Sequence, residues 1–113
     1  MIVSQIKGVM KMEFRKGYKI EIFIAGDCVD SLNNNILCVP SVGGSTIVPA
    51  YGYWYDYESE KIEEDSYVIV IVVEDEKTVD QIIRKIPLCV YDQDCVFVVV
   101  TEVKTKAIVF KKN

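Results

Sequence analysis

The 113-residue chain has the length of one domain, and half of its residues are apolar, 27% are charged and 11% are aromatic. This composition excludes intrinsic disorder, collagen-like repeats and low-complexity sequence. The absence of histidine excludes His-based general bases, His–Cys nucleophile pairs and His-ligated zinc. The net charge of −4 is uneven, because residues 1–19 and 104–113 are basic and the body between them is acidic. A nucleic-acid-binding protein would carry a stripe of Lys and Arg residues over the middle of the domain. This sequence has no such stripe there, so we expect no nucleic-acid partner.

The four cysteines indicate neither a metal site nor a disulfide framework. Their spacing contains no Cys-x-x-Cys pair, and the first residues lack the pattern of a signal peptide. Their valine and leucine neighbours are typical of reduced thiols in a core. The longest apolar run, residues 68–73, is far shorter than the roughly 20 residues of a membrane helix. We therefore expect a cytoplasmic protein with no membrane contact, no metal and no cofactor.

The first predicted elements are a strand over residues 19–24 and a short helix after it. Isoleucine at alternate positions of 19–24 is the pattern of a half-buried strand. Asp27 is placed to cap the helix, whose apolar residues are at helical spacing up to Ile36. The three asparagines at 33–35 are poor helix formers, so this helix is expected to be short.

Two more strands are predicted between residues 46 and 73. The first follows a Gly/Ser loop at 40–45 and runs through Tyr55. The second, over residues 66–73, is apolar at both odd and even positions, which indicates the centre of a sheet covered on both faces. Between them, residues 56–65 contain six acids and one lysine, so we expect a wide turn there.

A second helix and a further strand complete the predicted core. Three carboxylates at 74–76 suit a helix start, and Pro87 is expected to end the helix. Its predicted buried stripe consists of Val79, Ile82, Ile83 and Ile86. Residues 95–100 predict a central strand and residues 107–110 a short last one, while alternating apolar residues at 10–14 predict an N-terminal hairpin arm.

The order of elements predicts a fold of the α+β class. Strand, helix, strand, strand, helix, strand is the ferredoxin-like βαββαβ arrangement, an antiparallel sheet with two helices on one face. We expect a single domain over 1–113, with an arm or hairpin at 1–17, the core at 18–103 and a C-terminal strand or tail at 104–113. Because residues 67–73 and 96–100 are apolar at both parities, the other sheet face needs a cover, which a homo-oligomer or the terminal arms would supply.

An aromatic cluster is the most distinctive candidate site. In an unbroken strand its tyrosines, all at odd positions, would share one face, and Trp54 would point the other way. Such a cluster suits a subunit interface first, a purely structural cross-strand ladder second and a platform for a planar ligand third. The members are Tyr51, Tyr53, Trp54, Tyr55 and Tyr57.

A second candidate is the loop Gly43, Gly44, Ser45 and Thr46. Its backbone N–H groups and two hydroxyls could cradle an anion, but it lacks the lysine and helix of a P-loop, so a plain flexible loop is the alternative. The acidic residues do not have EF-hand spacing, and no serine or cysteine has a histidine partner. We therefore predict no catalytic residues and a protein that is not an enzyme.

One stretch of the chain resembles a known family. Tyr53-Trp54-Tyr55, followed by Lys-Ile-Glu-Glu-Asp at 61–65 and an apolar strand to Ile71, looks like the divalent-cation-tolerance (CutA-type) family. Its members carry Tyr-Trp-Trp, then Gly-Lys-Ile-Glu-Glu-Asp, then an apolar strand; they are ferredoxin-like, related in architecture to the nitrogen-regulatory PII proteins, and form tight homotrimers. The resemblance implies a trimer and small-ligand or metal sensing. With no histidine in the chain, it does not imply a copper site.

Two functional hypotheses follow. The first is a non-enzymatic, oligomeric binding or regulatory protein of the CutA/PII-like kind, which senses or sequesters a small ligand or mediates a protein interaction. The second is a phage or mobile-element accessory protein that binds a host macromolecule or a nucleotide. A third alternative, carboxylate-based catalysis, would require two coupled acids in a pocket.

Overall fold

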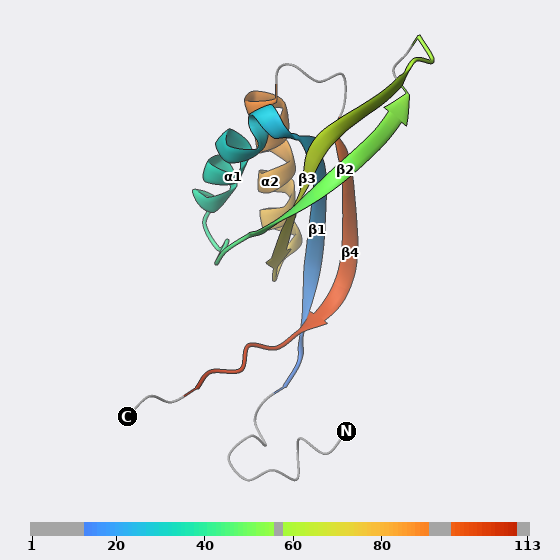
Figure 1. Cartoon of the computed structure of the whole chain (residues 1–113). Helices are drawn as coiled ribbons and strands as arrows, with labels where there is room; N and C mark the ends of the chain where they lie inside the picture. The colour runs from blue at the N-terminus through green and yellow to red at the C-terminus, as the bar shows by residue number, and fades with distance from the viewer. Residues whose placement is uncertain (1–12, 56–57, 91–95, 111–113) are drawn as a thin grey trace.

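Four strands form one antiparallel sheet in the order β2-β3-β1-β4. The computed structural model describes residues 13–55, 58–90 and 96–110. The elements follow one another as β1 (Arg15–Ala25), α1 (Val29–Leu37), β2 (Thr46–Tyr55), β3 (Lys61–Val73), α2 (Glu76–Cys89) and β4 (Phe97–Thr105). Both helices lie on one side of the sheet (Figure 1). The predicted ferredoxin-like fold is therefore confirmed.

The hydrophobic core lies between the helices and the two central strands. The register pairs Ile20 of β1 with Ile71 of β3 and Ile22 with Ile69, so these side chains share the face that the helices cover. All four are at most 1% exposed. Leu32 of α1 and Ile82 of α2 are fully buried against them. Alternate positions of the strands thus supply the sheet half of the core.

Helix α1 is short, as predicted, but it starts differently. A single 3₁₀ turn, Gly26–Cys28, precedes it, so Asp27 lies inside that turn and does not cap the helix. The N-cap position belongs to Cys28, whose side chain makes no capping hydrogen bond. The buried Cys28 side chain anchors the turn in the core, and this packing overrides the capping preference of Asp27.

Helix α2 has the predicted start and a later end. Asp75 accepts hydrogen bonds from the backbone N–H of Thr78 at 2.7 Å and from its hydroxyl at 2.8 Å. Pro87 lies inside the last turn, and the helix continues to Cys89. Ile83, predicted to be buried, is 40% exposed, because the stripe that faces the sheet is formed by Val79, Ile82 and Ile86.

The acidic stretch between β2 and β3 differs from the predicted wide turn. Strand β3 begins at Lys61, and its residues 61–65 pair with residues 51–55 of β2. The two strands form a long hairpin that extends past the helices (Figure 1). Charged side chains on this ribbon are tolerated because both of its faces are open to solvent there.

The opposite end of the sheet is formed by β1 and β4. Their ladder extends to the pair Arg15 and Thr105, beyond the predicted core limits of 18 and 103. Residues 106–110 have no regular secondary structure and no strand pairing in the described part of the chain, so the short strand expected at 107–110 is not seen there. The N-terminal arm expected at 1–17 lies outside the described residues except for 13–17.

Three cysteines are described, and none of them forms a disulfide. Cys28 and Cys89 are buried as expected, whereas Cys38 is exposed at the end of α1; Cys95 lies outside the described residues. In the ranges that the structure describes, no helix has the length and apolar character needed to cross a bilayer.

Candidate functional site

The hairpin of β2 and β3 presents a row of tyrosines, which we call the tyrosine face. It consists of Tyr51, Tyr53 and Tyr55, which alternate along β2 and are between 54% and 73% exposed. Directly opposite them on β3 lie Asp65, Glu63 and Lys61, in that order. The predicted sharing of one face by these tyrosines follows from the unbroken strand. Tyr57 lies outside the described residues.

The tyrosine face already holds a cation of its own. The Lys61 ammonium lies 5.2 Å from the centroid of the Tyr53 ring and 3.2 Å from the Glu63 carboxylate. Tyr51 and Tyr53 meet edge to face, with ring centroids 5.3 Å apart. Partial desolvation raises the pKa of Tyr51, and the charge of Glu63 adds to this effect. The Tyr51 phenol therefore stays neutral near pH 7, so its hydroxyl can donate a hydrogen bond.

Trp54 lies on the other face of the same hairpin. Its indole Nε1 donates a hydrogen bond of 3.0 Å to the Glu64 carboxylate. The indole ring also lies against the backbone of Gly52, where any Cβ would collide with it. Trp54 is half-buried in this way without a helix to cover it. The aromatic cluster is thus divided between two faces.

The Gly/Ser loop is separate from the tyrosine face. A Cβ at Gly43 or Gly44 would meet nothing within 4 Å, so no close backbone approach requires glycine at either position. The Ser45 hydroxyl donates to the side-chain oxygen of Asn33 in α1, and Thr46 is exposed at the start of β2. Thr46 and Tyr51 are five residues apart along one strand, or roughly 17 Å. The fold therefore does not bring the two predicted sites together.

The sheet face that the helices leave uncovered is apolar, and we call it the open face. Phe23 of β1 lies between Val68 of β3 and Phe97 of β4, and the two phenylalanine rings are 6.1 Å apart. Phe97 is 68% exposed. The apolar residues that strand alternation places on the open face include Phe23, Val48, Val68, Val70, Val72, Phe97 and Val99. The sequence predicted such a face because two strands are apolar at both odd and even positions.

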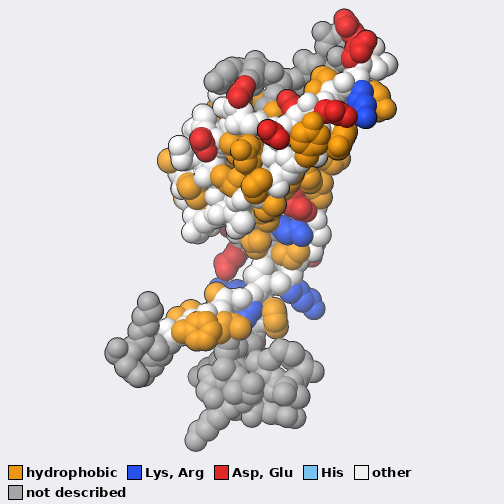
Figure 2. Space-filling model, in the orientation of Figure 1, with side chains coloured by type: hydrophobic (Ala, Val, Ile, Leu, Met, Phe, Trp, Pro, Cys, Tyr) orange, Lys and Arg blue, Asp and Glu red, His pale blue; other side chains and the backbone are white. Residues whose placement is uncertain are grey.

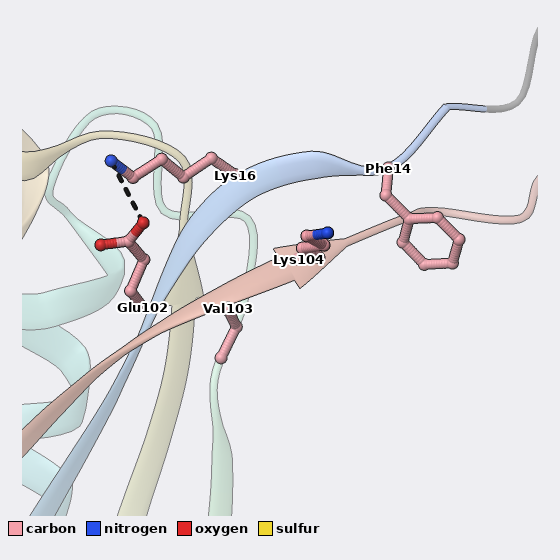
Figure 3. Close-up of a pocket in the computed structure, with 5 residues that line it drawn as sticks. All are labelled: Phe14, Lys16, Glu102, Val103 and Lys104. Carbon is pink, nitrogen blue, oxygen red and sulfur yellow. Dashed lines mark ion pairs between the residues drawn. The ribbon is translucent and has the colours of Figure 1, made fainter.

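An open concavity lies at the other end of the sheet, on β1 and β4 (Figure 3). Its lining includes the ion pair of Lys16 with Glu102, 3.2 Å apart, and the exposed Phe14. The hydrogen bond from Lys16 to Glu102 raises the pKa of that lysine, and Tyr18 contributes in the same direction. Sequence reasoning did not single out this place, because its residues come from the two ends of the chain. The only carboxylate of the lining is paired with Lys16, and the remaining titratable side chain of the lining is that of Lys104.

No cluster of three or more potential metal ligands occurs within residues 13–55, 58–90 and 96–110. Of the predicted site residues, Tyr51, Tyr53 and Tyr55 form the tyrosine face, Trp54 lies on the opposite face of the hairpin, and the Gly/Ser loop is separate from both. Figure 2 shows acidic side chains gathered at the outer end of the hairpin and basic ones toward the opposite end of the sheet.

Comparison with known proteins shows which solved structures share this fold. No protein-family model and no curated protein matches the sequence significantly. Solved structures do match: CPII, a nitrogen regulatory PII-like protein from Thiomonas intermedia bound to ADP, AMP and bicarbonate, has a TM-score of 0.67 and 17% identity over 86% of this chain and 100% of its own. CutA1 from Oryza sativa has a TM-score of 0.66 and 13% identity, covering 81% of this chain and 84% of its own. The fold is that of PII-like and CutA proteins.

An enzyme also shares this architecture. A phage SAM lyase in complex with S-methyl-5′-thioadenosine has a TM-score of 0.58 and 12% identity, covering 84% of this chain and 93% of its own. At such identities the likeness concerns the fold alone. The matches to PII-like and CutA structures confirm the resemblance of architecture. They do not show which chemistry this chain performs.

Proposed function

We propose that this chain is a small, non-enzymatic, homo-oligomeric regulatory protein of the cytoplasm, which binds a small ligand or a protein partner. The observation that carries the proposal is the open face. Burial of apolar surface stabilises by about 25 cal/mol per Å², and a contiguous apolar sheet face on a monomer is unusual. A second copy would cover this face with side chains of the same kind.

The resemblance to CutA and PII proteins makes a trimer the expected assembly. The open face is central to the sheet, so each copy would contribute β1 and β3 residues such as Phe23 and Val70. Only one ion pair, Lys19 with Glu21 at 3.8 Å, lies among these apolar side chains in the described part of the face. An interface with this composition resembles a divided core rather than a polar contact.

The ligand is proposed to contain an adenine nucleoside. Two of the compared structures support this class by their bound molecules, ADP and AMP in one and S-methyl-5′-thioadenosine in the other. In this chain the tyrosine face supplies aromatic rings on which such a molecule can stack, whereas Trp54 and the Gly/Ser loop at 43–46 are separate candidate positions. Each remains a candidate for a ligand or interface role.

Light scattering coupled to size exclusion tests the assembly. We expect a mass of three chains for the wild type and a shift to monomer for Val70→Glu, since a carboxylate at Val70 would be buried without a partner. Asp80→Lys on the exposed surface of α2 is the matched control and should leave the mass unchanged. A wild-type monomer at micromolar concentration would contradict the proposal.

A thermal-shift series with ATP, ADP, AMP and adenosine tests the ligand class. Binding to the folded state raises the melting temperature, and the rise increases with the logarithm of the ligand concentration above Kd, so a shift that grows with concentration is expected for at least one of them. GTP serves as the control for general polyanion effects. The absence of any shift at millimolar nucleotide would exclude this ligand class.

The alternative function is a phage or mobile-element accessory protein that binds a nucleotide or a host macromolecule. The phage SAM lyase among the similar structures favours this alternative, because it combines the fold with phage origin and a nucleoside. Incubation of the protein with SAM, followed by chromatography for S-methyl-5′-thioadenosine, tests whether this chain has lyase activity. Turnover that exceeds a heat-denatured control would overturn the non-enzymatic proposal.

A further inference from the structure

Two surfaces in the described part of the chain have complementary chemistry. The first is the tyrosine face with the acids of β3 beside it. The second is the tail, residues 106–110, which follows β4. We propose that the tail of one copy docks on the tyrosine face of a second copy.

The tail has the composition of a docking segment. Ile108, Val109 and Phe110 are between 63% and 87% exposed, Lys106 precedes them in the tail, and Lys104 lies at the end of β4. Its sequence favours a strand, yet no strand of the described chain pairs with it. A segment with apolar and basic side chains that can adopt a strand conformation is suited to lie along a strand edge that offers aromatic and acidic side chains.

A contact already present on the tyrosine face indicates how a lysine of the tail would bind there. Lys61 already lies over the Tyr53 ring and beside Glu63, which combines a cation–π contact with an ion pair. The neighbouring position repeats this arrangement, because Tyr51 lies directly opposite Asp65. In the described part of the chain, no ion pair or cation–π contact involves Tyr51 or Asp65, so this position can accept a lysine of the tail. The tyrosine rings supply apolar surface for Phe110.

Strand β2 is also an edge of the sheet. Its outer backbone groups have no neighbour in the described sheet, so an extended segment can add to them by main-chain hydrogen bonds. The tail would then contribute both a short strand and its side chains to the second copy.

The occupant must belong to a second copy because the chain's own tail cannot reach. Thr105 is opposite Arg15, and ten residue steps along β1 lead to Ala25, which is level with Ser66 and Ala50 just below the tyrosine face. At about 3.3 Å per residue this separation is about 33 Å. Residues 106–110 span at most about 18 Å when fully extended. Figure 1 shows the tail and the hairpin at opposite ends of the molecule.

Binding of a labelled peptide to the full chain tests the proposal. The peptide has the sequence of residues 104–113, and the receptor carries Ile108→Ser and Phe110→Ser so that its own tails do not compete. We expect saturable binding by fluorescence anisotropy, weakened at least about fivefold by Asp65→Lys and by Tyr53→Ala in the receptor. A rise in salt from 50 to 500 mM should weaken it as well.

Matched controls define the outcome. Asp80→Lys makes the same charge change on α2 and should leave the affinity unchanged, and a peptide with its four lysines replaced by glutamate should not bind. Asp65→Asn, which keeps the shape of the side chain, should also weaken binding if Asp65→Lys is poorly folded by circular dichroism. Absence of saturable binding, or equal affinity for the Asp65→Lys and Asp80→Lys receptors, would overturn the proposal.

The test is independent of the assembly proposed above. Val70 lies on the open face, so Val70→Glu should abolish the trimer while leaving peptide binding unchanged. If the wild-type protein is monomeric but binds the peptide, the proposed trimer fails and the docking proposal stands. If the trimer forms and the peptide does not bind, the reverse holds.

Discussion

Glycine and tryptophan form a matched pair in the hairpin. The indole of Trp54 lies over the Gly52 backbone because Gly52 has no Cβ, and the Nε1 donor then reaches Glu64. This is the one place in the hairpin where a close approach requires glycine. The contact holds the only tryptophan of the chain in a half-buried position outside the core. Side-chain packing across the ribbon thus stabilises a hairpin that no helix covers.

Gly52→Ala should displace the indole from the hairpin. Because the added Cβ collides with the ring, Trp54 would lose its hydrogen bond to Glu64 and become exposed. We expect a red shift of tryptophan emission and faster acrylamide quenching, with little change in far-ultraviolet circular dichroism. Gly43→Ala, where a Cβ meets nothing, is the control and should leave the emission unchanged. An unshifted emission maximum in Gly52→Ala would contradict this account of the contact.

Asp75 should make stability depend on pH at the acidic end. Hydrogen bonds from the backbone N–H and hydroxyl of Thr78 to the carboxylate lower the pKa of Asp75 below its usual range. The contribution is therefore fully present above the ordinary aspartate pKa near 4 and is lost as the pH falls through the lower pKa of the folded state. Asp75→Ala should lower the melting temperature by several degrees at pH 7 and by less at pH 3. Asp80→Ala on the same helix should show no such difference in calorimetry.

At the scale of elements, strand β3 serves two surfaces at once. Ile71 is 1% exposed under the helices, whereas its neighbour Val72 is 46% exposed on the open face. Both residues are apolar and β-branched, so only their parity separates them. The strand is therefore a core strand on one side and, under the proposed assembly, an interface strand on the other.

Ile71→Ala and Val72→Ala should differ in their cost to the folded monomer. Removal of buried methylene groups at Ile71 should lower the free energy of unfolding by about 2–5 kcal/mol, because it also leaves a cavity. Val72→Ala should cost less than about 1 kcal/mol when the Val70→Glu background keeps the chain monomeric. Urea unfolding in that background measures both. An equal loss of unfolding free energy in the two variants would contradict the conclusion that the helices cover only the face of β3 that carries Ile71.

For the whole molecule, the two ends of the sheet carry different chemistry. The hairpin is aromatic and acidic, whereas the ends of β1 and β4 and the tail are basic and apolar. Such polarity suits head-to-tail contacts between copies, which close into rings when the rotation permits. The open face between the ends supplies the apolar area that these charged contacts lack.

Thermal stability should depend on protein concentration. If folding is coupled to assembly through the open face, dilution favours the unfolded state, so the melting temperature should rise with concentration. Val70→Glu should remove this dependence and leave a lower, constant value. Calorimetry over a hundredfold range of concentration measures both. A concentration-independent wild-type melting temperature, together with a monomer mass, would contradict the proposed assembly.

The sequence determined the local elements and their order. Alternating isoleucines at 20–24 and the double apolar parity of 66–73 set the strands, and the carboxylates at 74–76 set the start of α2. Since a βαββαβ order has few compact solutions, the ferredoxin-like fold followed from the pattern. The same parity also predicted that a second sheet face would need a cover.

Only the tertiary structure decided the features that depend on contacts between distant residues. The extension of β3 into the acidic stretch arises from cross-strand partners such as Tyr53 and Glu63, which a single-strand pattern does not reveal. The burial of Cys28, rather than the capping tendency of Asp27, set the start of α1. Local preferences amount to fractions of a kcal/mol per residue, whereas burial of one large side chain contributes several times more. Where the two compete, tertiary packing prevails, and these are the places where the sequence alone was insufficient.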